Sequence, residues 1–331
     1  MGMNGMKKVI GVGSPIVDML ARVSEEFVGS IPGDKGGMVL VDRDGMAGLV
    51  SRLEEPPLRA PGGSAANTIV AMARMGVPAA FLGKVGEDED SRYYLDAFAA
   101  AGGDTSRFKR TPEEPTARCL SLVTPDSERT MRTNLGAAML MEPAEVSAAD
   151  FAGCDHAHIE GYLLYNRPLT EAVLRAAKAA GCTVSLDLGS FEVVGLSSDV
   201  LPALLEAYVD AVFANEDEAR AFPGGDTPER ALDALAACCG TAVVKLGPQG
   251  ALLRRGGETV RASIVPADAV VDTTGAGDCW AAGFLYGWLQ DWDLARCGRL
   301  GAVLGSETVR QMGAVPASAD AWARISAACR G

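Results

Sequence analysis

Val271-Asp272-Thr273-Thr274-Gly275-Ala276-Gly277-Asp278 stands near the C-terminal end of this 331-residue chain, directly before the apolar run 279–289. The apolar run predicts a helix, and the glycines on either side of Ala276 predict an irregular turn that opens it. Because the first amides of a helix have no partner within it and carry the positive end of its dipole, such a turn binds anions. Asp278 would repel an anion, unless it takes the proton of a nucleophile that attacks a bound phosphate. A helix-capping role is the alternative that its position leaves open.

The composition limits the partners of the chain. Hydrophobic residues make up 48% of it, enough for a large core, and its formal net charge is −13. Since no Lys/Arg cluster is visible, we expect neither nucleic acid nor a membrane surface as a partner. No apolar run approaches the ~18–20 residues that span a bilayer. Without a visible signal peptide or a C-x-x-C pair among the eight cysteines, we expect a cytoplasmic protein with reduced thiols.

The second half of the chain predicts a doubly wound, mainly parallel α/β sheet, because expected strands alternate with expected helices. The strands are expected at 155–160, 182–188, 210–214 and 241–246, and the helices at 144–152, 168–180, 198–208, 216–222 and 227–238. In such sheets ligands bind at the carboxyl ends of the strands. Four polar residues stand there, namely Glu160, Asp187, Asn215 and Lys245. His156 and His158 alternate on one strand, but without a third soft ligand they favour zinc only weakly.

The first half carries a separate β element. A strand at 37–41 follows the first strand without a long helix between them, and the extended runs 116–123 and 129–134 are joined by a short turn. We therefore expect residues 16–45 and 114–134 to form a small inserted β-sheet lid. Residues 1–15, 46–113 and 135–331 would form the α/β domain. An open edge of the lid sheet could pair with a second subunit, so a monomer and a homodimer through the lid both remain open.

A second glycine turn, Gly62-Gly63, precedes another apolar helix. Two glycines let a ligand approach the backbone, and Asn67 in the first helical turn would face the same space. A tight turn capped by Ser64 is the alternative. The pair Gly11-x-Gly13 suggests a dinucleotide fold, but Pro15 and Ile16 break the G-x-G-x-x-G pattern and disfavour a nicotinamide-dependent dehydrogenase.

These features, in this order, resemble the ribokinase (PfkB) family of ATP-dependent sugar and nucleoside kinases. The resemblance rests on the stretch 272–278, on Asn215-x-x-Glu218 and on the Gly62-Gly63 turn with Asn67, and it covers essentially the whole chain. The stretches 13–18, 61–67 and 129–135 are most similar to the adenosine-kinase-like branch. The resemblance implies a ribokinase-like fold and transfer of phosphate from ATP to a primary hydroxyl of an adenosine-like ribonucleoside. Free sugars such as ribose, fructose or 2-keto-3-deoxygluconate are the alternative acceptors, and a non-catalytic nucleotide-binding regulator is the remote alternative.

The resemblance also implies a role for each residue of the site. Asp278 would be the catalytic base, and the migrating phosphoryl group would be held by Gly275, Ala276, Gly277 and, from the lid, Arg129. The acceptor would be bound by Asp18, Gly62, Gly63 and Asn67. ATP would contact Asn215, Lys245, Gly247, Gly250, Ala302 and Ser306, and the segments 245–250 and 302–309 would line the adenine pocket. Mg²⁺ would be held through water by Asn215 and Glu218, and a K⁺ site would resemble the family's at Asp272, Thr274 and Gly313. The helix start would lower the pKa of Asp278 and burial would raise it, a balance that the sequence leaves open.

Overall fold

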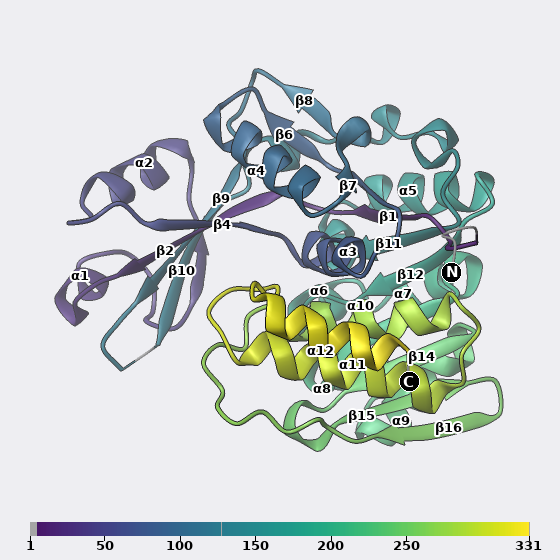
Figure 1. The fold of residues 1–331 in the computed structure, drawn as a ribbon. Coiled ribbons are helices and arrows are strands. Elements are labelled where there is room, and N and C mark those ends of the chain that lie inside the picture. Colours follow the sequence, from purple (N-terminus) through teal and green to yellow (C-terminus); the bar gives the residue numbers. More distant parts are fainter. Residues whose placement is uncertain (1–4, 127, 331) are drawn as a thin grey trace.

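The computed structural model describes residues 5–126 and 128–330, and its main body is a nine-stranded sheet (Figure 1). The strand order is β16-β15-β14-β13-β12-β11-β1-β5-β7. The strands are β1 (Val9–Val12), β5 (Ala79–Leu82), β7 (Gly103–Asp104), β11 (His156–Glu160), β12 (Thr183–Asp187), β13 (Ala211–Asn215), β14 (Thr241–Lys245), β15 (Ala251–Arg255) and β16 (Glu258–Ala262). The pairs from β7 to β14 are parallel, and β15 and β16 continue the sheet antiparallel. The predicted doubly wound sheet is therefore present.

Helices cover both faces of this sheet. One face carries α3 (Ser64–Arg74), α4 (Glu89–Ala100), α10 (Ala276–Trp288), α11 (Leu294–Val309) and α12 (Ala319–Arg330). The other carries α5 (Arg167–Ala179), α6 (Phe191–Leu196), α7 (Leu201–Tyr208), α8 (Glu216–Ala221) and α9 (Pro228–Cys238). Successive strand residues alternate between the two cores, as Val9 and Ile10 do in β1. No helix of the described residues is both long enough and apolar enough to cross a membrane.

The helix expected at 144–152 is wrong. Two short 3₁₀ segments, Pro143–Glu145 and Ala148–Phe151, stand there instead. Each begins with its own capping box, formed by Glu142 with Glu145 and by Ser147 with Asp150. The extended residue Val146 separates the two segments. A chain that satisfies its backbone donors with side chains every few residues does not propagate one continuous helix.

A five-stranded sheet forms the lid, on the left of Figure 1, in the order β3-β10-β9-β2-β4. Its strands are β2 (Ile16–Arg22), β3 (Met38–Leu40), β4 (Leu58–Gly62), β9 (Ala117–Val123) and β10 (Arg129–Asn134). The edge strand β4 pairs with β2, although we expected residues 46–62 in the α/β domain. The sequence of β4 conceals the strand because it contains Pro61, which a sheet tolerates only at an edge.

The lid sheet has one covered face and one that turns to the α/β domain. Helices α1 (Glu25–Gly29) and α2 (Arg43–Ser51) cover the first, where Met19 and Leu120 pack with Val28 and Met46. The alternate residues lie on the face from which Arg129 reaches the α/β domain. At the edge strand β4, the Arg59 and Gly62 carbonyl oxygens accept hydrogen bonds from the Tyr93 and Tyr94 hydroxyls of α4 over 2.8 and 2.9 Å. The described edge on which a second subunit could pair is therefore β3.

Candidate active site

Four parallel strands end in polar residues at one edge of the main sheet. Glu160, Asp187, Asn215 and Lys245 are the last residues of β11, β12, β13 and β14. The strand register places Glu160 beside Asp187 and Asn215 beside Lys245. Helix α10 begins beside this edge, because a Cβ built on Gly277 in its first turn would lie 3.3 Å from the Lys245 ammonium nitrogen. The polar strand ends and the start of α10 therefore lie at the same edge of the sheet.

The turn before α10 leaves amides free for an anion. Gly275 is the N-cap residue and has a φ of 71°, and a Cβ built on it would lie 2.2 Å from the Ala314 carbonyl oxygen, so only glycine fits there. The amide of Ala276 donates to the Thr273 carbonyl over 3.2 Å. Within the described chain, the amides of Gly275, Gly277 and Asp278 have no backbone partner. Of the three predicted phosphoryl-holding amides, those of Gly275 and Gly277 are free and that of Ala276 is used within the turn.

Asp278 joins α10 to α3. Its two carboxylate oxygens accept hydrogen bonds of 2.9 Å from the Ser64 hydroxyl and from the Asn67 side-chain amide. Its backbone carbonyl accepts a third bond of 3.1 Å from the Thr68 hydroxyl. Asp278 makes no capping bond, and Gly63 rather than Ser64 is the N-cap of α3. The capping alternatives for Asp278 and Ser64 are therefore wrong, and Asn67 contacts Asp278 through a hydrogen bond that we did not predict.

Burial decides the protonation of Asp278. It raises the pKa of the carboxyl group to about 6, and the neighbouring charge of Asp187 adds to the effect. The hydrogen bonds from Asn67 and Ser64 and the charge of Lys245 act in the opposite direction. A carboxylate with this pKa is ionised at neutral pH and is a better proton acceptor than an ordinary aspartate.

Asp18 lies on β2 at the lid side of the site. A Cβ at Gly62 would lie 2.2 Å from an Asp18 carboxylate oxygen, so glycine there makes room for the acid. Gly63 has a different reason, because its φ is 100° and a Cβ would lie 2.3 Å from the Ser14 carbonyl oxygen. Burial raises the pKa of Asp18 to about 7, the charge of Arg129 lowers it, and the charge of Asp278 raises it.

Glu160 and Tyr162 belong to the surroundings of the site, although we predicted no role for either. The buried carboxylate of Glu160 accepts hydrogen bonds from the amides of Ala65 (3.3 Å) and Ser14 (3.4 Å), and burial raises its pKa to about 7. Tyr162 follows β11 and is 41% exposed. The signal for Glu160 was its place at a strand end, whereas nothing in the sequence distinguishes Tyr162 from a core aromatic residue.

Asn215 and Glu218 form a capping box at the start of α8. The Asn215 side-chain oxygen accepts from the Glu218 amide over 2.9 Å, and the Asn215 backbone and side-chain N–H groups donate to Glu218 over 2.8 and 2.6 Å. Burial and then the charge of Asp187 raise the pKa of Glu218 above its usual range. These hard oxygen ligands suit Mg²⁺, and since each already holds a hydrogen bond, contact through water is the arrangement that fits.

The other residues predicted to contact ATP separate into two places. Gly247 opens a 3₁₀ turn, and Gly250 lies so close to β16 that a Cβ would be 2.1 Å from the Ala262 carbonyl oxygen. Ala302 and Ser306 stand one turn apart on α11, and the Ser306 hydroxyl lies 3.4 Å from the Pro266 carbonyl oxygen. Lys245 turns away from them and forms an ion pair of 2.8 Å with Asp187.

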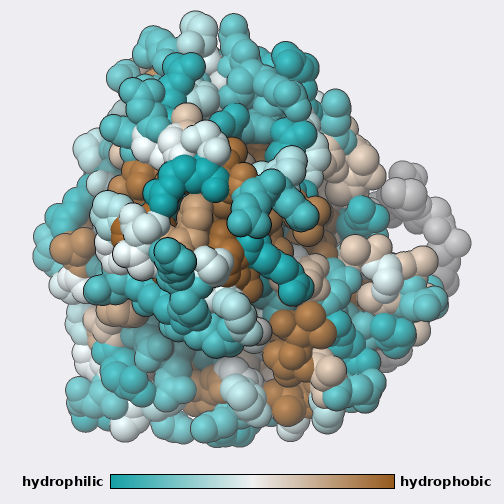
Figure 2. Space-filling model, turned by 90° about the vertical axis from the view of Figure 1, so that its left-hand side faces the viewer, coloured by the Kyte–Doolittle hydropathy of each residue, from teal (hydrophilic) through white to brown (hydrophobic). Residues whose placement is uncertain are grey.

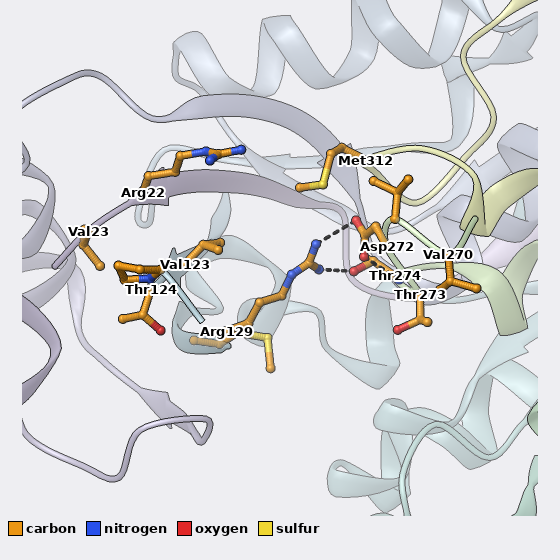
Figure 3. A pocket seen from close by; sticks show the side chains of 13 residues that line it. Arg22, Val23, Val123, Thr124, Arg129, Val270, Asp272, Thr273, Thr274 and Met312 are labelled. Carbon is orange, nitrogen blue, oxygen red and sulfur yellow. Dashed lines mark hydrogen bonds and ion pairs between the residues drawn. The ribbon is translucent and has the colours of Figure 1, made fainter. Parts of the chain in front are cut away.

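Arg129 crosses from the lid to the loop before α10 (Figure 3). Its guanidinium lies 2.7 Å from Asp272 and also bonds to the Thr274 hydroxyl. This contact borders a cavity of about 880 Å³ between the lid hairpin and residues 270–274. Asp272 also accepts from the amides of Thr274 (2.9 Å) and Gly313 (3.0 Å). The three residues predicted for K⁺ thus meet, but an ion on the Asp272 carboxylate would compete with Arg129.

The two histidines are buried, and their ring nitrogens form hydrogen bonds with hydroxyl groups. His156 contacts Thr183 and Ser185, and His158 contacts Ser185, over 2.8–2.9 Å. Burial lowers the pKa of His156 to about 3 and that of His158 to about 4, so both are neutral. The described residues contain no group of three or more His, Cys, Asp or Glu side chains arranged to hold a metal ion.

Comparisons with known proteins give a consistent family. The model for the pfkB family of carbohydrate kinases matches residues 44–321. An ATP-dependent ribose-1-phosphate kinase from Halopiger xanaduensis is 32% identical over 293 residues, which cover 86% of this chain and 90% of that protein. The crystal structure of adenosine kinase from Sinorhizobium meliloti has a TM-score of 0.85 at 34% identity and covers 98% of this chain and 99% of its own.

A probable sugar kinase from Rhizobium etli CFN 42 gives the same TM-score of 0.85 at 33% identity, with 98% of both chains covered. These likenesses confirm the predicted ribokinase-like α/β fold with its small extra sheet.

Proposed function

The chain belongs to the pfkB family of carbohydrate kinases, and from this premise we propose that it transfers the γ-phosphoryl group of ATP to a primary hydroxyl of a ribonucleoside-like acceptor. In this reaction the acceptor oxygen forms a bond to the γ-phosphorus, the bond from that phosphorus to the bridging oxygen breaks, and ADP leaves. The hydroxyl proton passes to Asp278. The observation that carries the proposal is the Asp278 carboxylate, held by Ser64 and Asn67 beside the free amides of Gly275 and Gly277.

The chain's own residues supply positioning and charge. Phosphoryl transfer needs an in-line arrangement and stabilisation of charge on the equatorial oxygens more than it needs covalent help. The amides of Gly275 and Gly277 face that charge, and Arg129 reaches the same loop from the lid. Asn215 and Glu218 would hold Mg²⁺ through water, and the ion would neutralise phosphate charge. The segment 247–250 with Ala302 and Ser306 would line the adenine pocket, as proposed from the family resemblance.

The acceptor class follows from the lid face above Asp18. This face presents Leu20 and Met131, both half-buried, and Leu40, which is 60% exposed. Figure 2, which views the molecule from the lid side, shows apolar surface gathered in the middle of that side. Tyr162 adds an exposed aromatic ring at the end of β11. A free sugar carries hydroxyl groups all round and would leave such surface unmatched, whereas a nucleobase has apolar faces.

A screen of ATP consumption over chosen acceptors tests the proposal. The panel contains ribonucleosides, beginning with adenosine, against ribose, fructose, 2-keto-3-deoxygluconate and ribose 1-phosphate. We expect the highest kcat/KM with a ribonucleoside. A free sugar or a sugar phosphate as the best acceptor would refute the acceptor class and retain the kinase. Binding of ATP without phosphorylation of any member would instead favour a non-catalytic regulator.

A further inference from the structure

A buried ion pair lies beneath the start of α10. The Lys245 ammonium is 2.8 Å from the Asp187 carboxylate, and the two side chains are only 14% and 7% exposed. Burying such a pair costs desolvation, and apolar residues of similar size often stabilise a protein as well or better. Stability alone therefore gives no reason for a lysine at this place.

The ammonium of Lys245 lies on the anion side of α10. A Cβ built on Gly277 would be 3.3 Å from the Lys245 nitrogen. Because Cα–Cβ bonds in a helix tilt toward its N-terminus, the ammonium flanks the N-terminal end of α10. The free amides of Gly275 and Gly277 are at that same end. Glycine at 277 thus keeps open the space that the ammonium occupies.

Three carboxylates hold the charge of Lys245. Burial opposes that charge, but the nearby carboxylates of Asp187, Glu218 and Asp278 outweigh it, and the pKa of Lys245 is raised above its usual range. The hydrogen bond to Asp187 fixes the ammonium in place. The lysine is therefore a permanent, oriented positive charge, and it costs no reorganisation when negative charge develops beside it.

We propose that Lys245 is a catalytic residue, with Asp187 as its positioning residue: the ammonium donates to an equatorial oxygen of the phosphoryl group in transfer, beside the amides of Gly275 and Gly277. This inference rests on the proposed phosphoryl transfer and replaces the adenine contact first expected of Lys245. No bond to Lys245 forms, and its protons stay on it. The acceptor proton still passes to Asp278.

Three variants and a matched control test the role of Lys245. Lys245→Met should lower kcat by roughly 10²–10³-fold, as the loss of one preorganised donor does, and Asp187→Asn should lower it less because the ammonium remains. The double variant, Lys245→Met with Asp187→Asn, also lacks the unpaired carboxylate that Lys245→Met leaves buried. Its kcat should stay as low as that of Lys245→Met. The control, Lys84→Met, breaks another ion pair of a buried lysine, Lys84–Glu145 at 2.8 Å, in which Glu145 is one-third exposed. It should keep the wild-type kcat in its folded fraction.

Recovery of wild-type kcat in the double variant would overturn the proposal, because Lys245 would then serve only to neutralise Asp187. An undiminished kcat in Lys245→Met would overturn it as well. Thermal unfolding of every variant shows whether a loss of kcat comes from unfolded protein.

A binding measurement makes the test independent of the acceptor. Calorimetry compares ADP alone with ADP plus aluminium fluoride, a mimic of the phosphoryl group in transfer, each with Mg²⁺. Lys245→Met should weaken binding of the mimic by roughly tenfold or more while ADP binding changes little. Equal weakening of both would refute the contact with the transferred group. If no acceptor in the panel is phosphorylated, the proposed function fails, and this measurement still decides the role of Lys245.

Discussion

Replacing the proposed base by its amide, Asp278→Asn, isolates proton transfer from structure. The carboxylate now accepts from the Ser64 hydroxyl and from the Asn67 amide, each over 2.9 Å. In the variant, the new amide oxygen can accept from Asn67, and the new NH₂ group can donate to Ser64, because a hydroxyl both donates and accepts. The contacts between α3 and α10 therefore survive, and only the ability to take a proton is lost.

The size of the effect follows from the role. General-base catalysis contributes roughly 10²–10⁴-fold, which corresponds to about 3–5 kcal/mol of barrier. Stability should move in the opposite direction. Because burial raises the pKa of Asp278 from 3.8 to about 6, the folded state binds the proton more tightly than the unfolded state does. Above pH 6 the ionised carboxylate thus destabilises the fold, and the neutral amide removes that cost. We expect slower turnover together with an unchanged or higher melting temperature.

The assay measures ADP release at saturating ATP and Mg²⁺ with the best acceptor of the panel, and scanning calorimetry measures melting at pH 7.5. Asp320→Asn is the matched control, because Asp320 is an exposed acid in the first turn of α12. It should leave turnover unchanged. Turnover of Asp278→Asn within about tenfold of the wild type would refute the assignment of the base.

Three further predictions use the same assay. Turnover should fall as the pH drops through about 6, the pKa of Asp278, because only the ionised base accepts a proton. At pH 5 it should be about one-tenth of its plateau value. A profile that is flat down to pH 5 would contradict the assignment of Asp278 as the base. Arg129→Met should lower kcat by roughly 10²-fold through the loss of a charge from the lid, and unchanged kcat would place Arg129 outside catalysis. Gly62→Ala should raise the acceptor KM by roughly tenfold and spare the ATP KM, because its Cβ would lie 2.2 Å from the Asp18 carboxylate; an unchanged acceptor KM would show that Asp18 does not hold the acceptor.

Local patterns in the sequence predicted the frame of the site. The apolar strands 210–214 and 241–246 and the glycine turn before Asp278 carry signals within a few residues, and the structure places them at one edge of the sheet. The helix at 144–152 and the boundary of the lid were wrong for a related reason. Capping boxes at Glu142 and Ser147 and the edge strand β4 depend on which backbone groups find partners, and periodicity does not report that.

Contacts between remote segments escaped prediction because no short pattern encodes them. The bonds of Asp278 to Ser64 and Asn67 join residues 214 and 211 positions apart. The ion pair of Lys245 with Asp187 spans 58 positions. The family resemblance placed Lys245 with residues 246–250 in the adenine pocket. Its long side chain instead reaches Asp187, the carboxylate at the end of β12.

The raised pKa values of the buried acids explain how a site bordered by carboxyl groups can bind an anion. A phosphate beside fixed negative charges would be repelled, yet Asp18, Glu160 and Asp278 all border this site. Burial raises the pKa of Asp18 and of Glu160 to about 7 and that of Asp278 to about 6. Near neutral pH, Asp18 and Glu160 are therefore partly protonated and can take up a proton when a phosphate approaches, whereas Asp278 stays mainly ionised and ready to accept one. Burial raises the pKa of all three carboxyl groups, and only at Asp278 do hydrogen bonds from Asn67 and Ser64 and the charge of Lys245 oppose it. These partners come from remote segments, which residue type and net charge do not specify.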